Sequence, residues 1–529
     1  MSFYQWVVFF LLVQVVHFLG AWKIYKAAGR KSWEAAIPVY NAIVLMKIIN
    51  RPGWWTILLF VPIVNLIMFP VVWVETLRSF GKNTALDTFL GVATCGLYIY
   101  YINYAQKLNY ISNRSLKAEG GVGDTVSSFL FAIVVATIVH TYVIQPFTIP
   151  SSSLEKSLLI GDFLFVSKFH YGARVPMTAV AAPMVHDSLP IVHTKSYLSW
   201  PQLPYFRFPG FEKISNNDIV VFNWPRDTLF NMYKPADKRY DKPIDKKTNY
   251  VKRCVGISGD SLQIKNGIVF INGKELILPE RAKPQYSYKV AYDGKTPIDF
   301  EYLLKDMKVT DRVDFLDPEK RDTLRFSALT FESAERLRQT PGITAVTRVI
   351  NKGAEDGIFP DFQDGRPSLT SDWNCDNYGP IYIPQAGKTV ALDKKTLPLY
   401  KIIITEYEGN QLKVDGDAIY INGQKVTTYT FKQNYYWMMG DNRHNSLDAR
   451  YFGYTPENHI VGKPVFIWMS WDTNGKGLSK IRWERMFTTV SGDGQPQSYF
   501  KYFLILLILY FVFDFFMKKR KEKNSNDVK

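Results

Sequence analysis

Three short sequence blocks hold residue types that together can hydrolyse a peptide bond. The first is Pro150-Ser151-Ser152-Ser153, which follows an apolar run at residues 126–145. The second carries Lys252, and the third is the polar segment 440–450, Gly-Asp-Asn-Arg-His-Asn-Ser-Leu-Asp-Ala-Arg. A serine hydroxyl is a weak nucleophile, but a neutral lysine amine can take its proton as a general base. The blocks therefore indicate serine–lysine hydrolase chemistry at a membrane face.

The lysine lies in a segment that reads as a β-strand, Tyr250-Val251-Lys252-Arg253-Cys254-Val255. Side chains alternate between the two faces of a strand, so Lys252 shares a face with Tyr250 and Cys254. A lone lysine in a strand normally lies on a solvated face. Apolar and aromatic neighbours instead disfavour the ammonium form and lower the pKa of the amine. Lys252 is therefore expected to supply neutral amine near neutral pH.

Taken singly, the first block is weak evidence, because serine runs after membrane segments are usually linkers. The third block is the most specific of the three, although by chance alone it could be a polar turn. Their order and wording, however, closely resemble the type I bacterial signal peptidases. The lysine block matches the family's wording except for Ser258, where Pro is common, and the third block matches it except for His444, where Asp is usual. In the serine block Leu154, Lys156 and Ser157 replace Met, Pro and Thr, and the matching residues are Pro150, Ser151, Ser153, Leu158, Gly161, Asp162, Lys168, Tyr171 and Gly172.

The resemblance implies catalytic roles for four residues. Ser153 would be the nucleophile, and Lys252 the general base and later the general acid. Ser151 would help a backbone N–H hold the oxyanion of the tetrahedral intermediate, where negative charge develops. Ser446 would donate a hydrogen bond that orients the amine of Lys252.

The resemblance also implies a supporting network. Asp448 and Arg450 would form salt bridges together with Arg253, and Gly440 would permit a close backbone approach. His444 suggests a serine–histidine–aspartate triad as an alternative. That alternative leaves the lysine block unexplained.

Substrate binding is expected to follow the family as well. The cleavage segment would bind as an extended strand, which points its −1 and −3 side chains the same way into neighbouring pockets. Small residues, Ala above all, are expected at both positions. The alternative is that the proposed pocket walls are simply the core of the domain. These walls are Phe147, Ile149, Pro150, Leu154, Leu158, Leu164, Tyr250 and Val251.

Five apolar runs predict membrane helices, at residues 3–22, 54–77, 86–105, 126–145 and 502–517. Each is close to the roughly 20 residues that span a bilayer, where only a helix satisfies its own backbone. The first run lacks the basic start of a cleavable signal peptide, which favours an anchor. Residues 32–50 read equally well as an interfacial segment or a packed connector.

Orientation follows from the basic residues in the short loops. Lys and Arg gather between the first two runs, after the third run and in the tail. Keeping these segments in the cytoplasm predicts an outer N-terminus, five crossings and residues 146–500 on the outer face. For the family that the chain resembles, this is the periplasmic face of the bacterial inner membrane.

The outer part reads as β-rich. Residues 261–276 and 412–423 both carry alternating apolar residues around Asn-Gly turns, which suit hairpins. Duplication and chance recurrence explain this likeness equally well. Residues 324–350 predict a strand–helix–strand insert remote from the chemistry, and residues 356–377 predict a loop.

The predicted fold is a multi-pass α-helical membrane anchor joined to a mainly antiparallel β catalytic domain with an α+β insertion. The predicted division is a membrane region at 1–145, the catalytic domain at 146–284 and 411–500 with the insertion at 285–410 between them, a C-terminal membrane helix at 501–517 and a basic cytoplasmic tail at 518–529.

Composition excludes several functions. The net charge of +16 is concentrated at the ends of membrane segments, which indicates membrane topology and argues against nucleic-acid binding. The three cysteines are scattered, so they predict no disulfide framework, although a Cys254–Cys375 pair stays open. The seven histidines lack ligand spacing, so no metal and no cofactor are expected.

The sequence thus predicts a membrane-bound serine endopeptidase that removes signal peptides from exported preproteins. Its expected partners are preproteins that carry signal peptides, the lipid bilayer and, as a further candidate, the protein-export machinery. The alternative is a catalytically silent membrane scaffold that binds exported chains. The presence together of Ser151, Ser153, Lys252 and Ser446 argues against it, because binding requires none of them.

Overall fold

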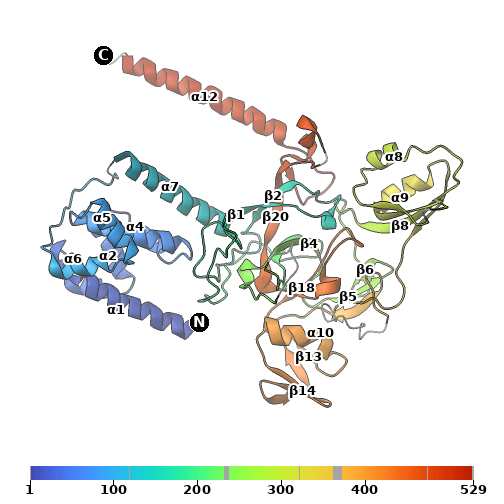
Figure 1. The fold of residues 1–529 in the computed structure, drawn as a ribbon, viewed down its shortest axis with the longest axis horizontal. Helices are drawn as coiled ribbons and strands as arrows, with labels where there is room; N and C mark the ends of the chain where they lie inside the picture. Colours follow the sequence, from blue (N-terminus) through green and yellow to red (C-terminus); the bar gives the residue numbers. More distant parts are fainter. Residues whose placement is uncertain are drawn as a thin grey trace. The chain divides into compact units, whose positions relative to one another are not determined.

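The computed structural model describes residues 2–117, 120–230, 238–317, 319–320, 322–360, 372–473 and 475–526 (Figure 1). Parts of the predicted 356–377 loop and of the basic tail lie outside these ranges. The chain divides into two compact units. The first joins Met1–Ile144 to Gly172–Pro209 and Thr228–Lys247, and the second joins Gln145–Tyr171, Gly210–Asp227 and Thr248–Lys529.

These units differ from the predicted division at residue 145, because two later segments pack with the N-terminal helices. The indole Nε1 of Trp6 donates a hydrogen bond to the carbonyl of Gln202 (2.9 Å). Ile63 forms a small buried cluster with Ala181 and Tyr197. Segments after residue 171 therefore belong to the helical unit.

The first unit is helical. Its helices are α1 (Phe3–Ala27), α2 (Tyr40–Ile48), α3 (Trp55–Leu58), α4 (Val64–Ser79), α5 (Ala85–Ala93), α6 (Tyr98–Ala105) and α7 (Gly120–Ile138), with a π-helical turn at Val139–Val143.

In the described part of the chain, three helices are long and apolar enough to cross a membrane: Phe3–Ala27, Gly121–Val143 and Phe500–Arg520. The predicted helices at 54–77 and 86–105 are wrong as continuous helices, because each run is broken into two. Pro62, which has no N–H donor, and Ile63, with φ 70°, interrupt the first of these runs. Cys95 and Gly96, with φ 50° and 82°, interrupt the second. The bend there is 116°, and counting this pair as one span would give four crossings.

Each broken run returns to its starting point. Glu75, near the end of the first run, accepts hydrogen bonds from Arg51, which precedes the run (2.9 Å), and from Arg78, which follows it (2.8 Å). Likewise, Nζ of Lys82, before α5, donates to Oε1 of Gln106, after α6 (3.3 Å). Both runs are therefore hairpins whose ends lie together.

The second unit is built on an eight-stranded sheet in the order β1-β2-β20-β3-β4-β18-β19, with β21 paired to β20. Its neighbours pair antiparallel from β2 to β19. This confirms the predicted antiparallel β domain. The strands are β1 (Ile144–Thr148), β2 (Asp162–Ser167), β3 (Ile219–Asn223), β4 (Asn249–Gly256), β18 (Tyr435–Met439), β19 (Thr455–Pro456), β20 (Ile460–Ser470) and β21 (Thr488–Thr489).

The two predicted Asn-Gly units are confirmed as three-stranded meanders with matching turns. One is β5 (Ser261–Lys265), β6 (Ile268–Ile271) and β7 (Lys274–Glu275), and β12 (Tyr378–Tyr382) pairs with β5. The other is β14 (Leu412–Asp415), β15 (Ala418–Ile421) and β16 (Gln424–Val426). In each, an Asn side chain at the second turn accepts a backbone N–H bond of 2.9 Å, from Ser261 to Asn272 and from Gln411 to Asn422.

A second four-stranded sheet, which we call the accessory sheet, has the order β11-β8-β10-β9. Helix α9 follows β10 and is capped by Thr330, whose side chain accepts from the N–H of Ser333, so the predicted strand–helix–strand unit is confirmed. Helices α8 and α9 pack on one face of this sheet. The elements are β8 (Gln285–Tyr292), α8 (Phe300–Asp306), β9 (Val313–Phe315), β10 (Thr323–Thr330), α9 (Phe331–Arg338) and β11 (Ile343–Arg348).

The remaining elements are β13 (Thr389–Ala391) paired with β17 (Thr428–Thr430), α10 (Leu397–Ile402), α11 (Ala449–Phe452) and the long C-terminal α12 (Phe500–Asn526). Strands β4 and β18 are neighbours in the main sheet, and the 440–450 loop follows β18 directly. This loop therefore starts beside the strand that carries Lys252.

Candidate active site

The structure brings together the two residues predicted as nucleophile and base. Ser153 lies in a single 3₁₀ turn, Ser152–Leu154, after β1, and Lys252 lies on β4. Nζ of Lys252 donates a hydrogen bond to Oγ of Ser153 at 2.6 Å. Both side chains are buried, with exposed fractions of 7% for Ser153 and 4% for Lys252. The proton that a nucleophilic serine must lose thus has an acceptor within direct reach.

The backbone around Ser153 is held by the 440–450 loop. The N–H of Asn442 donates to the carbonyl of Ser153 (3.0 Å). Gly440 faces the same carbonyl so closely that a Cβ there would lie 2.6 Å from it and 2.3 Å from Oγ of Ser446. Glycine is therefore required at 440 for the loop to approach the serine turn.

Burial of Lys252 has an electrostatic consequence. Removal from water lowers its pKa to about 8, although the nearby carboxylate of Asp448 acts in the opposite direction. Its Nζ also lies 5.3 Å from the ring centre of Tyr250, its predicted neighbour on the same strand face. A substantial fraction of this lysine is thus neutral near pH 8, as a general base requires.

Of the other two predicted serines, Ser446 has a buried hydroxyl and Ser151 is exposed. Ser446 lies against Gly440, but its buried Oγ has no hydrogen-bond partner among the described residues. The predicted bond from Ser446 to Lys252 is therefore not formed. Ser151 is exposed and lies just before the serine turn. Its role at the oxyanion stays a prediction.

The supporting charges form two separate pairs, which corrects the predicted single network. Arg253 binds Asp441 through two bonds, of 2.8 and 2.6 Å, with both side chains buried. Arg450 binds Asp448 in the same bidentate way, at 2.9 and 2.8 Å. Burial alone would raise the pKa of each aspartate, but the paired arginines hold both below the usual value.

The sequence analysis did not identify Asp441 as a site residue. Its carboxylate also accepts a hydrogen bond from Oγ of Ser157 (2.5 Å), which ties the serine block to the third block. The signal was in the sequence, because a buried Arg253 requires a carboxylate partner. Four aspartates lie in these blocks, at 162, 260, 441 and 448, and only the three-dimensional arrangement selects Asp441.

Two protein families match parts of this chain. A family described as "Signal peptidase, peptidase S26" matches residues 122–323 and 427–471, which contain Ser153, Lys252 and the 440–450 loop. The part of the chain that holds this site therefore belongs to the signal peptidase family. Residues 33–113 match a separate family of unknown function, so the two hairpins lie in a region with no assigned role.

Curated relatives support the same family. The chain is 24% identical over 351 residues to signal peptidase I of Buchnera aphidicola subsp. Baizongia pistaciae, which covers 66% of this chain and 77% of the relative. It is 24% identical over 376 residues to signal peptidase I of Helicobacter pylori strain 26695, covering 69% and 92%. For that of Haemophilus influenzae the values are 23% over 381 residues, 69% and 75%.

Half of the eight predicted substrate walls are core. The side chains of Ile149, Leu154, Leu158 and Leu164 have exposed fractions of 3% or less, and they belong to one buried cluster. Phe147 and Val251 are half-buried and pack against that cluster, Tyr250 is also half-buried, and Pro150 is exposed. The four accessible residues are the ones that a bound peptide could touch.

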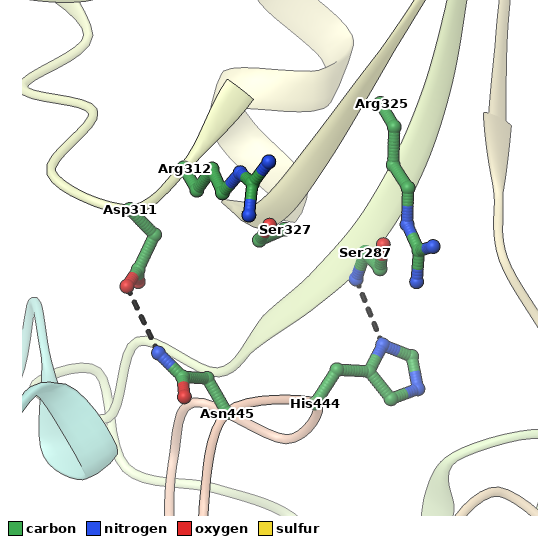
Figure 2. Close-up of a pocket in the computed structure, with 7 residues that line it drawn as sticks. All are labelled: Ser287, Asp311, Arg312, Arg325, Ser327, His444 and Asn445. Carbon is green, nitrogen blue, oxygen red and sulfur yellow. Dashed lines mark hydrogen bonds between the residues drawn. The ribbon is translucent and has the colours of Figure 1, made fainter. Parts of the chain in front are cut away.

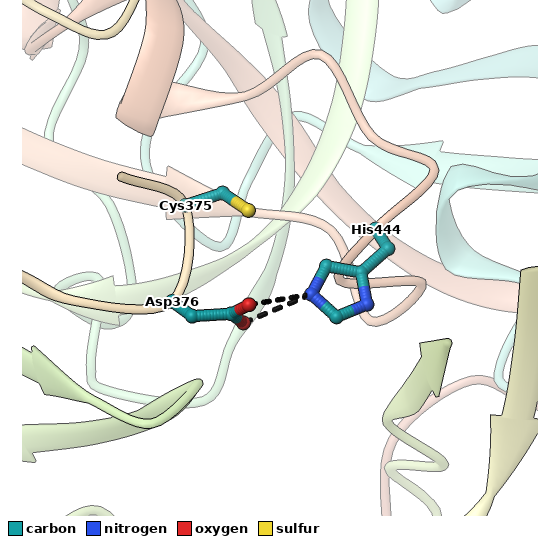
Figure 3. A group of neighbouring side chains, drawn as sticks. All are labelled: Cys375, Asp376 and His444. Atoms are coloured by element: carbon teal, nitrogen blue, oxygen red, sulfur yellow. Dashed lines mark hydrogen bonds and ion pairs between the residues drawn. The ribbon is translucent and has the colours of Figure 1, made fainter. Parts of the chain in front are cut away.

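Among the described residues, the ring of His444 is hydrogen-bonded to Ser287 and Asp376 and not to Ser153, which leaves the triad alternative without support. The N–H of Ser287 donates to its Nδ1 (2.9 Å), and its Nε2 meets the carboxylate of Asp376 at 2.9 and 3.0 Å (Figure 3). Together with Cys375 these side chains place ligand atoms within 4.8 Å of one another.

That group is poorly suited to a metal. Because Nδ1 of His444 accepts a hydrogen bond, the neutral ring carries its proton on Nε2, where a metal would have to bind. Burial raises the pKa of the Cys375 thiol to about 12, which disfavours the thiolate. Cys254 and Cys375 are both free, so the pair left open by the sequence is not formed.

The accessory sheet lies against the 440–450 loop, which we also call the catalytic loop, so the expectation that the strand–helix–strand unit would be remote from the chemistry is wrong. Asp311, before β9, accepts from the amides of Asn442 (2.8 Å) and Asn445 (3.0 Å). Asn445 also donates to Oγ of Ser152 (3.0 Å), the neighbour of the nucleophile. Sequence alternation identified the strands but not the surface that they face.

Proposed function

We propose that this signal peptidase cleaves signal peptides from exported preproteins by attack of Ser153, with Lys252 as general base. The observation that carries the proposal is the buried 2.6 Å contact between Nζ of Lys252 and Oγ of Ser153. The lowered pKa of Lys252 supports it, since the amine must be neutral to accept a proton.

The chemistry follows in two steps. Neutral Lys252 takes the Oγ proton while Ser153 attacks the carbonyl carbon of the −1 residue, and a backbone N–H together with Ser151 stabilises the oxyanion. The lysine ammonium then protonates the departing amine of the mature protein, leaving an acyl-enzyme. A water molecule, deprotonated by the same amine, hydrolyses the ester and releases the signal peptide. Lys252 thus serves as base and acid in turn.

Burial of Lys252 also argues against the scaffold alternative. Removing an amine from water disfavours its charged form, and a binding protein gains nothing from that cost. Beside a buried serine hydroxyl, the neutral amine that burial favours can act as a general base. The paired arginines 253 and 450 further hold the surrounding loop in place.

The pH dependence of cleavage tests the proposal. Purified protein is incubated with a preprotein, the cut is located by mass spectrometry, and kcat/KM is measured over about pH 6 to 10. We expect kcat/KM to level off above a pH of about 8 and to fall roughly tenfold per unit below it, because Lys252 becomes protonated. Circular dichroism at each pH shows whether the protein stays folded. A rate that is constant from mildly alkaline to mildly acidic pH would exclude a lysine base.

We infer further that three helices, α1, α7 and α12, cross the membrane, with the catalytic domain on the outer, periplasmic face of the inner membrane. The joined ends of both hairpins support this plan, because each hairpin then starts and ends on the cytoplasmic side. Five crossings would leave Arg78 and Lys82 outside, whereas three place them inside with the other basic loop residues. Both plans keep the tail in the cytoplasm, since two hairpins do not alter the parity.

Residue 83 distinguishes the two plans. In a Cys95→Ser background, Asn83→Cys is expected to be protected from a membrane-impermeant thiol reagent in spheroplasts and labelled only after permeabilisation. Lys413→Cys, on exposed β14 of the catalytic domain, is the matched control and should be labelled in both conditions. Labelling of residue 83 from outside would restore the five-crossing plan.

A further inference from the structure

A pocket lies between the accessory sheet and the catalytic loop (Figure 2). Its volume is about 270 Å³, enough for an amino-acid side chain. One wall is the face of the accessory sheet opposite to helices α8 and α9, and the other is the 440–450 loop. The lining residues are Ser287, Asp311, Arg312, Arg325, Ser327, His444 and Asn445.

The charges in this pocket leave one arginine available. Asp311, its only lining carboxylate, accepts hydrogen bonds from Asn442 and Asn445. Arg312 is bound to Asp314 (2.6 Å). Among the residues that the structure describes, the side chain of Arg325 makes no hydrogen bond or ion pair, and its guanidinium points toward the His444 side of the pocket. The pocket therefore offers a free cation beside serine hydroxyls, which suits a carboxylate.

The pocket is connected directly to the serine turn. Asn445, in its lining, donates to Oγ of Ser152 at 3.0 Å, and Asn442, beside it, donates to the carbonyl of Ser153 at 3.0 Å. An extended peptide advances about 3.3 Å per residue. A side chain within a few residues of the scissile bond can therefore reach it.

The substrate residues before and after the cleaved bond are expected to contact different parts of the protein. The apolar residues expected to contact positions −1 and −3 belong to β1, β2, β4 and the serine turn. The polar pocket is built by other elements, namely β8, β10, the segment before β9 and the catalytic loop. A peptide strand that fills the apolar side with its signal part directs its mature part elsewhere.

We propose that this pocket binds an acidic side chain of the preprotein within the first few residues after the cut, and that Arg325 determines this specificity. The inference rests on the proposed function, because it assigns a subsite to the same reaction. Asp and Glu carboxylates have the charge and the bidentate geometry that a guanidinium recognises.

The test compares substrates within each enzyme variant. Peptides carrying Glu, Gln or Lys at each of positions +1 to +4 are cleaved by the full-length protein, and kcat/KM is measured. At one of these positions we expect Glu to be cleaved about three- to fivefold faster than Gln, the size of a partly exposed ion pair. Arg325→Gln should abolish this ratio, and Arg325→Glu should make Lys the preferred residue.

The matched control is Arg338→Gln, which removes an exposed arginine of α9 outside the pocket and should leave the ratio unchanged. Because the ratio is read within one variant, a general loss of rate does not affect it. If Arg325→Gln fails to fold, the wild-type ratio must still decline as salt rises from about 0.02 to 0.5 M.

Equal rates for Glu and Gln at all four positions, or a ratio that survives Arg325→Gln, would overturn the pocket assignment. A preference confined to the signal side of the cut would overturn it equally. Cleavage of the Gln peptides at the correct bond by the wild-type protein would leave the proposed function standing in either case.

Discussion

Replacing Ser153 by Ala is expected to reduce kcat/KM for a signal-peptide substrate by at least about a thousandfold, because no other group can form the acyl-enzyme. The adjacent Ser152 provides a matched control. Its Oγ accepts a bond from Asn445 but does not contact Lys252, so Ser152→Ala should retain activity to within about tenfold. Rates are measured on purified full-length variants whose circular dichroism spectra match the wild type.

The same experiment extends to the base. Lys252→Met keeps the length of the side chain and removes its amine, so we expect a loss as large as that of Ser153→Ala. The double variant should be no worse than either single variant, since two groups that act as one unit do not add. Near-normal cleavage by the Ser153 or the Lys252 variant would exclude the pair, and additive losses would show that the two residues act separately.

Much of this site could be predicted from residue order alone. Lys252 lies two residues after Tyr250 in a strand and so shares its face, and that local rule already implied a shielded amine. The pairing of Arg253 with Asp441 was not accessible in the same way. The sequence offers Asp441 and Asp448 within one loop, and the register between β4 and β18 decides which of these carboxylates Arg253 meets.

The membrane region shows a different limit. Residues 54–77 and 86–105 are apolar over the length of a membrane helix, but this length does not tell whether the chain continues straight or turns back. Pro62 and the Cys95-Gly96 bend break the two predicted helices, and their effect depends on contacts that a hydropathy pattern lacks. Glu75 is the decisive residue for the first run, because its bonds to Arg51 and Arg114 join segments far apart in sequence.

The accessory sheet illustrates the same point for function. The sequence predicted a strand–helix–strand unit here but did not say which faces of its strands are buried. In β10 the buried Leu324 and Phe326 alternate with Arg325 and Ser327, which form an opposite polar face. No role was predicted for that face. It became a candidate subsite only when the structure placed Asn445 and His444 opposite to it.

Replacing Asp448 by Asn is expected to destabilise the protein by about 3–5 kcal/mol. The change preserves volume, so a cavity is not the cause. It leaves the guanidinium of Arg450, which is 1% exposed, without its charged partner in an interior where a lone charge is costly. The free energy of unfolding is measured by denaturant titration of the detergent-solubilised full-length protein, with fluorescence of the buried Trp437 as the signal.

The exposed pair Arg338–Glu335 is the control for that measurement. Its two side chains are 48% and 57% exposed, so Glu335→Gln should change the unfolding free energy by about 1 kcal/mol or less. The double variant Asp448→Asn with Arg450→Met should recover part of the loss, because removing both charges eliminates the uncompensated one. A loss below about 1 kcal/mol for Asp448→Asn would contradict the assigned role of this pair. Recovery of stability without recovery of cleavage would separate two contributions of Asp448: neutralising Arg450, and holding the Gly440 N–H that brings the loop against Ser153.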